Sequence, residues 1–168
     1  MSKTLILSFA VATVLSAPAT GAWAKDSAGQ AFIKKAIEGN LSEVAVGQLA
    51  QQKGSSDGVK NFGRQLETDH SNANQQAISV ANSIGVTPPS EPAKQQKAVY
   101  QKLSKLSGQA FDREFAKDMV ADHKKDIAEY QQEAKRQNDP AANYASQTLP
   151  TLQNHLQMAQ SLSNPKTQ

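Results

Sequence analysis

Two nine-residue segments of this chain, Phe62–His70 and Phe115–His123, carry phenylalanine, aspartate and histidine at identical spacing. They contain two of the three histidines in the sequence, and the third is His155. Neutral imidazole nitrogens are good ligands for zinc, copper, nickel and iron. The chemistry that these residue types suggest first is therefore the binding of one transition-metal ion by three histidines.

Four acidic residues are candidates to complete or orient such a site: Asp69, Asp122, Asp126 and Glu43. A second interpretation needs no metal. In it, each histidine lies at the boundary between core and solvent and bonds to a neighbouring aspartate or to a backbone carbonyl. The sequence has no His-x-x-x-His pair that would fix a ligand geometry, so both interpretations stay open.

The elements that must position these residues are helices. Apolar residues at steps of three and four predict four long helices over 27–52, 59–84, 107–137 and 140–164. We expect Pro150 to kink the last helix or to restart it near Thr148. The link over 85–107 is long enough to lead from one end of a bundle to the other, and its part 93–106 has the pattern of a short accessory helix. The sequence therefore predicts an all-α four-helix bundle.

The histidines are expected to share one level of this bundle. His123 lies 14 residues before the predicted helix end at Gln137, and His155 lies 15 residues after Pro140, so both lie about 21 to 23 Å from the connecting turn. His70 lies near the middle of its helix. Glu43 falls within about two turns of that level. It shares a line with Gly47 and other small residues, where a second helix can approach closely, although Glu43 could equally face water.

The first 24 residues have the features of a secretory signal peptide. Met1 and Lys3 precede an apolar run over 5–17, and Ala22-Trp23-Ala24 follows as a cleavage site. We expect cleavage after Ala24, which leaves residues 25–168 as one periplasmic domain. The chain has no cysteine, so we expect neither a lipoprotein anchor on cysteine nor a disulfide.

Charge and hydropathy limit the classes of binding partner that the sequence predicts. The formal net charge is +3, and removal of Lys3 leaves 17 basic against 15 acidic residues, a net charge of +2. Because no run of like charge occurs, nucleic acid is not an expected partner. No later apolar span predicts an integral membrane segment. Two kinds of interaction stay open: binding of an unknown protein partner and self-association into oligomers.

Four motifs carry a resemblance to a known family. They are S-E-V-A-V-G-Q-L-A around Glu43, F-G-R-Q-L-E-T-D-H, S-G-Q-A-F-D-R-E-F-A-K-D-M-V-A-D-H, and T-L-P-T-L-Q-N-H-L around His155. In this order they resemble an exported bacterial domain-of-unknown-function family with a ferritin-like fold, often labelled "predicted outer membrane protein". The resemblance implies a ferritin-like four-helix bundle with a long crossover between the second and third long helices. It implies no activity, and the strands of an outer-membrane barrel are not predicted.

A ferritin-like di-iron centre needs a Glu-x-x-His pair on each of two helices and a further glutamate on each of the other two. Glu67 and His70 form one such pair, and Glu43 could serve as a single glutamate. Val120 and Leu152 stand where His123 and His155 would need a carboxylate. Oxygen-activating di-iron chemistry is therefore not expected.

Other catalytic motifs are lacking, including a cysteine nucleophile, a G-x-S-x-G elbow, a phosphate-binding loop and a dinucleotide fingerprint. We therefore favour a non-enzymatic exported bundle with an interaction or stress-related role and a central His/Asp layer for a metal ion. Two alternatives stay open: a metal-dependent oxidoreductase, and a metal carrier or sensor.

Overall fold

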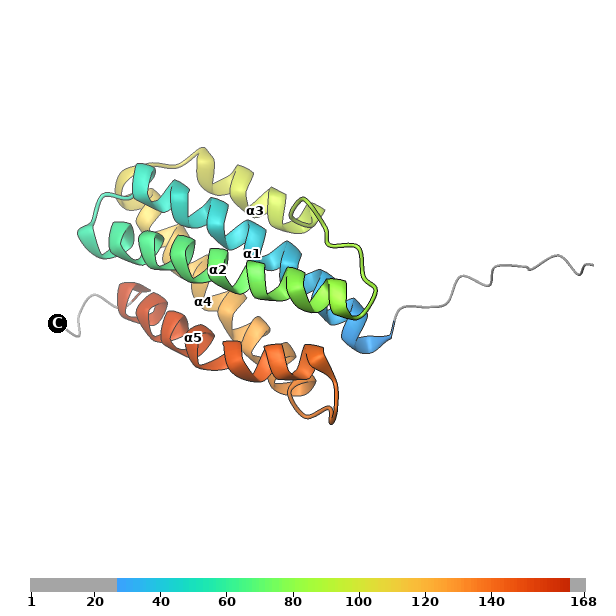
Figure 1. The fold of residues 1–168 in the computed structure, drawn as a ribbon. Coiled ribbons are helices and arrows are strands. Elements are labelled where there is room, and N and C mark those ends of the chain that lie inside the picture. The colour runs from blue at the N-terminus through green and yellow to red at the C-terminus, as the bar shows by residue number, and fades with distance from the viewer. Residues whose placement is uncertain (1–26, 164–168) are drawn as a thin grey trace, which may run out of the picture.

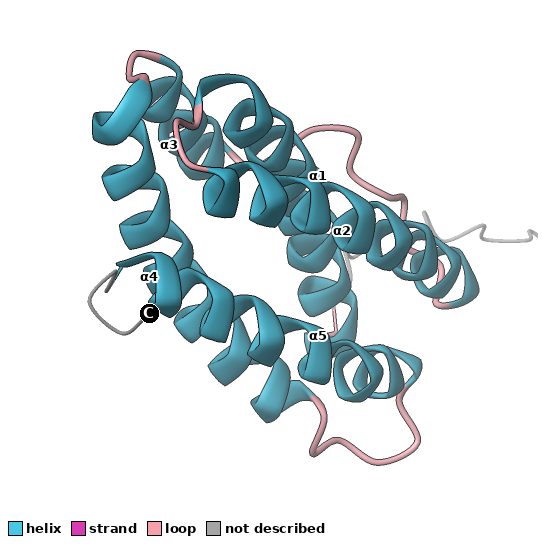
Figure 2. Ribbon diagram, turned by 90° about the vertical axis from the view of Figure 1, so that its left-hand side faces the viewer, coloured by secondary structure: helices cyan, strands magenta, loops and turns pink. Residues whose placement is uncertain are grey.

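The computed structural model describes residues 27–163, so the predicted signal peptide lies outside the described residues. This part of the chain folds into five helices: α1 (Ala28–Lys53), α2 (Asp57–Ser83), α3 (Lys94–Ser104), α4 (Gly108–Glu133) and α5 (Pro140–Ser163). Figure 2 shows no strand between residues 27 and 163, which confirms the all-α prediction. The accessory helix predicted within the long link is α3.

Local side-chain bonds fix the helix starts. Ser27 accepts from the backbone N–H of Gln30, whose side chain bonds back to the N–H of Ser27, a reciprocal capping box. Ser56 caps α2 through a single bond, in which its hydroxyl oxygen accepts from the N–H of Val59. Asp139 accepts from the N–H of Ala141 at 2.9 Å and so caps α5.

Helix α4 ends at Glu133, four residues before the predicted end at Gln137. The chain turns because Asn138 adopts a left-handed backbone conformation, with φ of 56°, which asparagine tolerates better than most residues. Arg136 lies between Glu133 and Asp139 and pairs with both carboxylates, at 3.2 and 3.1 Å. The turn is thus tied to the ends of both helices that it joins.

The four long helices form two antiparallel hairpins, α1 with α2 and α4 with α5 (Figure 1). Between them, α3 packs against α1 and leads the chain back to the end of the bundle where α2 begins. The return is visible at Asp112, near the start of α4, whose carboxylate accepts from the backbone N–H groups of Ser55 and Ser56 at 2.8 and 2.9 Å. These contacts confirm the crossover.

The core has two apolar clusters with polar residues between them. One contains Phe32, Ile37, Tyr130, Tyr144 and Leu152 among others. The other contains Val46, Leu66, Phe115, Met119 and Ala159 among others. Along each long helix, the residues between the two clusters include one buried histidine or, on α1, buried polar groups. The clusters therefore bury most of the apolar surface, which stabilises the bundle, and the polar layer lies where they meet.

The buried face of α1 differs from the predicted stripe. The apolar residues Leu41, Val44 and Ala45 are only partly buried, whereas the polar residues Asn40, Ser42 and Glu43 are buried. Helix α1 contacts all four other helices, so its buried face is wider than a single stripe. The periodicity of apolar residues does not register polar residues that point inward.

Pro150 lies inside α5, which continues through it without restarting. Proline supplies no N–H to the helix. Two residues before it, the hydroxyl of Thr148 donates to the carbonyl of Tyr144 at 2.9 Å. None of the helices within residues 27–163 is both long and apolar enough to cross a membrane.

Helices α1 and α2 approach most closely at two glycines. A Cβ atom placed on Gly47 would lie 2.6 Å from the carbonyl oxygen of Gly63, and one placed on Gly63 would lie 2.6 Å from the carbonyl oxygen of Gly47. Both distances are far below van der Waals contact, and the obstacle is backbone that cannot rotate away. Close approach of a second helix at Gly47, as predicted, is therefore confirmed.

The Gly47→Ala variant should lower the free energy of unfolding by about 1 to 3 kcal/mol, because the added methyl forces the two backbones apart. Urea unfolding followed by circular dichroism would measure this. Gly39→Ala is the matched control on the same helix, since its Cβ would meet only the flexible side chain of Gln96, at 3.6 Å. That control should be neutral or stabilising by about 0.5 to 1 kcal/mol. Equal effects of the two substitutions would contradict the close-approach argument.

Candidate metal centre

The three histidines meet in the polar layer. His70 comes from α2, His123 from α4 and His155 from α5, and their side chains are only 4%, 1% and 0% exposed. One ring nitrogen of each lies within 4.8 Å of one from each of the others. The common level predicted from helix lengths is thus observed. Their burial differs from the interpretation that places each histidine at the boundary between core and solvent, but His155 and His123 make the bonds that this interpretation expects, to Asp69 and to a backbone carbonyl.

Two of the rings have one nitrogen whose protonation is set by its partner. The Nδ1 atom of His123 lies 3.0 Å from the carbonyl oxygen of Met119, and the Nε2 atom of His155 lies 2.9 Å from a carboxylate oxygen of Asp69. A carbonyl and a carboxylate can only accept hydrogen bonds. These two nitrogens therefore carry the proton of the neutral ring. Asp69 is itself held by the side chain of Gln65, which donates to it at 2.7 Å.

The third ring is oriented through an amide. Asn40 donates from its nitrogen to the hydroxyl of Tyr144 at 3.0 Å, so its oxygen faces the Nδ1 atom of His70 at 2.9 Å. Nδ1 of His70 therefore donates to Asn40. The other nitrogen of this ring, Nε2, is buried and has no hydrogen-bond partner.

The remaining nitrogens of His123 and His155 face each other. Nε2 of His123 and Nδ1 of His155 are 3.3 Å apart. Each of these two neutral rings carries its only N–H proton on its other nitrogen, which bonds to Met119 or to Asp69. Both of the facing nitrogens therefore present a lone pair. No hydrogen atom is then available to join them. Together with Nε2 of His70, the layer gathers three unprotonated nitrogens.

Burial lowers the pKa of all three rings and so disfavours their protonation. Burial lowers the pKa of His70 well below its usual value, and the neighbouring histidines lower it further. Burial, followed by repulsion from His155, lowers the pKa of His123 to about 4. Burial also lowers the pKa of His155, against the attraction of Asp69. At neutral pH all three rings are uncharged, as metal ligands must be.

The predicted acidic residues take different places around this layer. Asp69 holds His155. Glu43 on α1 and Asp122 and Asp126 on α4 form a second group, which is called the carboxylate cluster below. Burial raises the pKa of Glu43 well above its usual value, and Asp122 and Asp126 add to the shift. Burial and repulsion from Asp122 raise the pKa of Asp126 to about 7.

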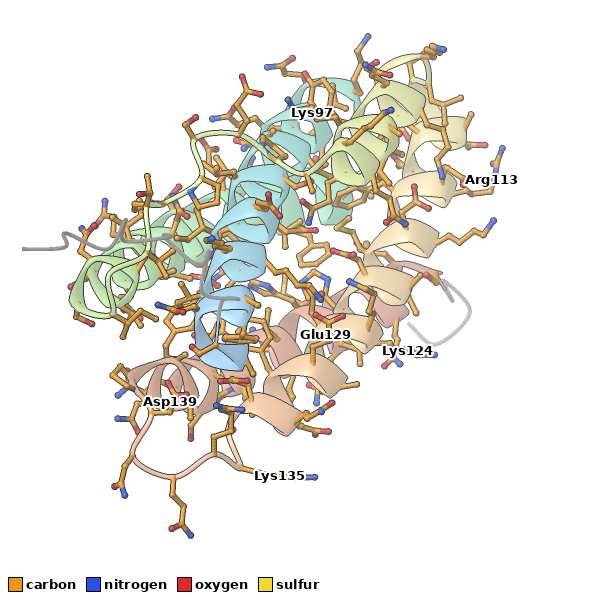
Figure 3. The ribbon with its side chains drawn as sticks, turned by 90° about the vertical axis from the view of Figure 1, so that its right-hand side faces the viewer. Lys97, Arg113, Lys124, Glu129, Lys135 and Asp139 are labelled. Carbon is orange, nitrogen blue, oxygen red and sulfur yellow. The ribbon has the colours of Figure 1, made fainter. Side chains whose placement is uncertain are left out.

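A cavity of about 340 Å³ leads to this region between α1, α3 and α4. His70 lines it, and so do Asn40, Asp122 and Asp126. Glu129, another lining residue, lies in Figure 3 on the side of α4 that faces α1. The cavity therefore gives the histidine layer a polar connection to the surface.

Glu67 does not take part in the layer. Its carboxylate accepts hydrogen bonds from Gln48 at 2.8 Å and Gln51 at 2.7 Å, on the side of α2 that faces α1. The Glu67-x-x-His70 spacing thus does not place both side chains at one site. With Val120 and Leu152 beside the other histidines, the carboxylates of a ferritin-like di-iron centre are not assembled.

Three contributors to the layer were not predicted: the amide of Asn40, the hydroxyl of Tyr144 and the carbonyl of Met119. Asn40 left a signal in the sequence, because it lies one turn after Ile37 on the apolar face of α1. The hydroxyl of Tyr144 is bonded to Asn40 inside the core. The role of Met119 belongs to its backbone, which no side-chain pattern reveals.

In metal-free protein, His123 should make stability fall at acid pH. The unfolded ring takes up a proton below about pH 6.5, while the folded ring stays neutral down to about pH 4. The stability present above pH 6.5 is thus lost as the pH falls to about 4, by about 3 kcal/mol. Wild type and His123→Leu should be compared by urea unfolding at pH 7.5 and 4.5.

The difference in free energy of unfolding, wild type minus His123→Leu, should be smaller at pH 4.5. Comparison at equal pH matters because Asp126, with its pKa raised to about 7, acts in the opposite direction: its protonated form stabilises at low pH, and this contribution is lost as the pH rises to 7. Asp126 is present in both proteins. A difference that does not change with pH would contradict a neutral His123.

Comparisons with other proteins agree with this fold. The family described as "Domain of unknown function (DUF4142)" matches residues 13–162. No curated protein matches the chain. A crystal structure of protein DUF305 from Streptomyces coelicolor, which is described as secreted, superposes with a TM-score of 0.64 at 11% identity, over 80% of this chain and 91% of that one. At this identity the likeness concerns the fold alone.

Proposed function

The chain belongs to the DUF4142 family, and we propose that it is a metal-binding protein that holds one transition-metal ion between His70, His123 and His155. One observation carries the proposal. The N–H group of each ring is fixed on an acceptor, which leaves a lone pair on the other nitrogen of each ring, and one ring nitrogen of each histidine lies within 4.8 Å of one from each of the others. A cation that accepts electron pairs is the partner that this arrangement lacks.

Energetics favour a cation over an empty layer. A buried polar atom without a partner costs about 1 to 3 kcal/mol, and the nearest pair of nitrogens, at 3.3 Å, also repels when neither carries a proton. An added proton would satisfy one pair of nitrogens at most, and burial disfavours its charge. A single metal ion would satisfy all three nitrogens together.

The ligand set suits borderline metals. Three imidazoles without a thiolate fit zinc, copper, nickel or iron, and copper(II) has the highest affinity for such nitrogen ligands. Three protein ligands leave a further coordination position open. The contacts with Asn40, Asp69 and the carbonyl of Met119 would orient the rings, which is the usual role of groups that bond to metal-ligating histidines.

Metal binding without catalysis is the role that we favour. The carboxylates of a di-iron centre are not assembled, which speaks against oxygen activation of the ferritin type. The cavity beside His70 favours one alternative, a metal-dependent oxidoreductase that admits a small substrate, because it gives the layer a polar connection to the surface. Export to the periplasm is part of the proposal, and it rests on the signal peptide predicted over residues 1–24.

Elemental analysis tests the proposal directly. Untagged protein, purified without chelator and exposed to zinc, copper, nickel and iron salts in turn, should hold close to one ion per chain. The His70→Ala/His123→Ala variant should hold almost none, because a single imidazole remains. Since alanine leaves cavities, His70→Gln/His123→Gln serves as a second variant, and circular dichroism checks that each protein is folded. Wild-type protein that retains no metal would refute the proposal.

Asp69→Asn should weaken metal binding by about 10-fold to 100-fold, the usual effect of losing a group that bonds to a metal-ligating histidine. The amide no longer attracts the proton of His155 as the carboxylate does, so the proton can move to the inner nitrogen. Competition with a chelator of known affinity would measure the change. Glu67→Gln, two residues away on the same helix and bonded only to glutamines, is the matched control and should bind as wild type. Equal affinity in all three proteins would exclude this role of Asp69.

A further inference from the structure

The carboxylate cluster has no role in holding the histidine rings. Asp122 and Asp126 lie one turn apart on α4 and so share a face of that helix. Glu43 faces them from α1, and its side chain is only 3% exposed. One oxygen of Glu43, Oε2, is buried without a hydrogen-bond partner. An unpartnered carboxyl oxygen inside a protein is costly, and a ligand at this place would satisfy it.

Two cavities meet at this cluster. The cavity of about 340 Å³ is lined by Asp122, Asp126 and His70. A second cavity, of about 210 Å³, is lined by Glu43 and again by Asp122. Asp122 precedes His123 in the sequence. The cluster therefore borders both cavities, and the larger of them also reaches His70.

Acidic residues outnumber basic residues around the cluster. The larger cavity is lined by four acidic residues and two lysines, and the latter are Lys35 and Lys125. Lys125 lies 3.7 Å from Asp126 and 3.4 Å from Glu129, so its charge is shared between two carboxylates. Burial and mutual repulsion hold the pKa values of Glu43 and Asp126 above their usual range. A cation bound at this place would displace the protons that these raised pKa values retain.

We propose that Glu43, Asp122 and Asp126 form an oxygen-ligand site that receives a divalent transition-metal ion from the cavity and passes it to the three histidines. Carboxylate oxygens bind copper or zinc less tightly than three imidazoles do, so transfer toward the histidines is downhill. The unpartnered Nε2 of His70 belongs to a side chain that lines the same cavity. It is the nitrogen best placed to take the ion first.

This inference rests on the proposed function, and its test is kinetic. Stopped-flow absorption would follow the ligand-field band of copper(II) as it reaches the histidines. In the Glu43→Gln/Asp126→Asn variant, uptake should be at least ten times slower than in wild type. The copper bound after long incubation should stay close to one ion per chain, because the histidines are unchanged. Both substitutions keep side-chain volume, and each single variant is available if the double variant does not fold.

The control must convert two carboxyl groups to amides elsewhere. Glu91→Gln/Glu114→Gln does so at sites that line neither cavity. Measurements at 0.15 M salt screen attraction over distances beyond about 8 Å. The control should take up copper at the wild-type rate. If it slows as much as the cluster variant, general charge explains the effect and the proposed site is wrong.

Two failures can be told apart. Wild-type protein that binds no copper would refute the three-histidine centre, and the uptake site with it. Wild-type protein that binds one copper ion, at a rate unchanged in Glu43→Gln/Asp126→Asn, would refute only the uptake site. In that case the three carboxyl groups would merely share protons inside the core.

Discussion

The structure depends on one constraint, the fixing of each imidazole by its outer nitrogen. Asp69 and the carbonyl of Met119 each hold a ring proton on the side away from the other rings, and Asn40 does the same for His70. Without these acceptors the rings could exchange protons with one another and close into an ordinary hydrogen-bonded cluster. With these acceptors in place, the ring nitrogens that face the other rings carry no proton. The candidate metal centre is therefore a property of the acceptors as much as of the histidines.

A polar layer of this kind needs strong support, because buried polar groups weaken a core. Here the support comes from the two apolar clusters, one on each side of the layer. The sequence has no cysteine to add a cross-link, so packing and helix capping must suffice. The contacts of Asp112 with Ser55 and Ser56, and of Arg136 with Glu133 and Asp139, fasten the ends of the hairpins.

The level of the histidines could be predicted from the sequence because helix rise is constant and a short turn fixes the relative height of two antiparallel helices. The error of four residues at the end of α4 did little harm, since the turn takes up the difference. The partners could not be predicted in this way. Asn40 is a polar residue on an apolar stripe, and Met119 acts through its backbone. Glu43 could be placed only once the position of α4 was known.

The contact between Gly47 and Gly63 also sets the register of the first hairpin. Asn40 lies seven residues before Gly47, and His70 lies seven residues after Gly63. In two antiparallel helices these steps lead in the same direction, by about 10 Å and almost two full turns. Asn40 and His70 are therefore brought to the same height and the same side, where their hydrogen bond forms. The absence of a side chain at Gly47 and at Gly63 thus fixes the register of α1 against α2, and this register sets the position of Asn40 relative to His70 two turns away.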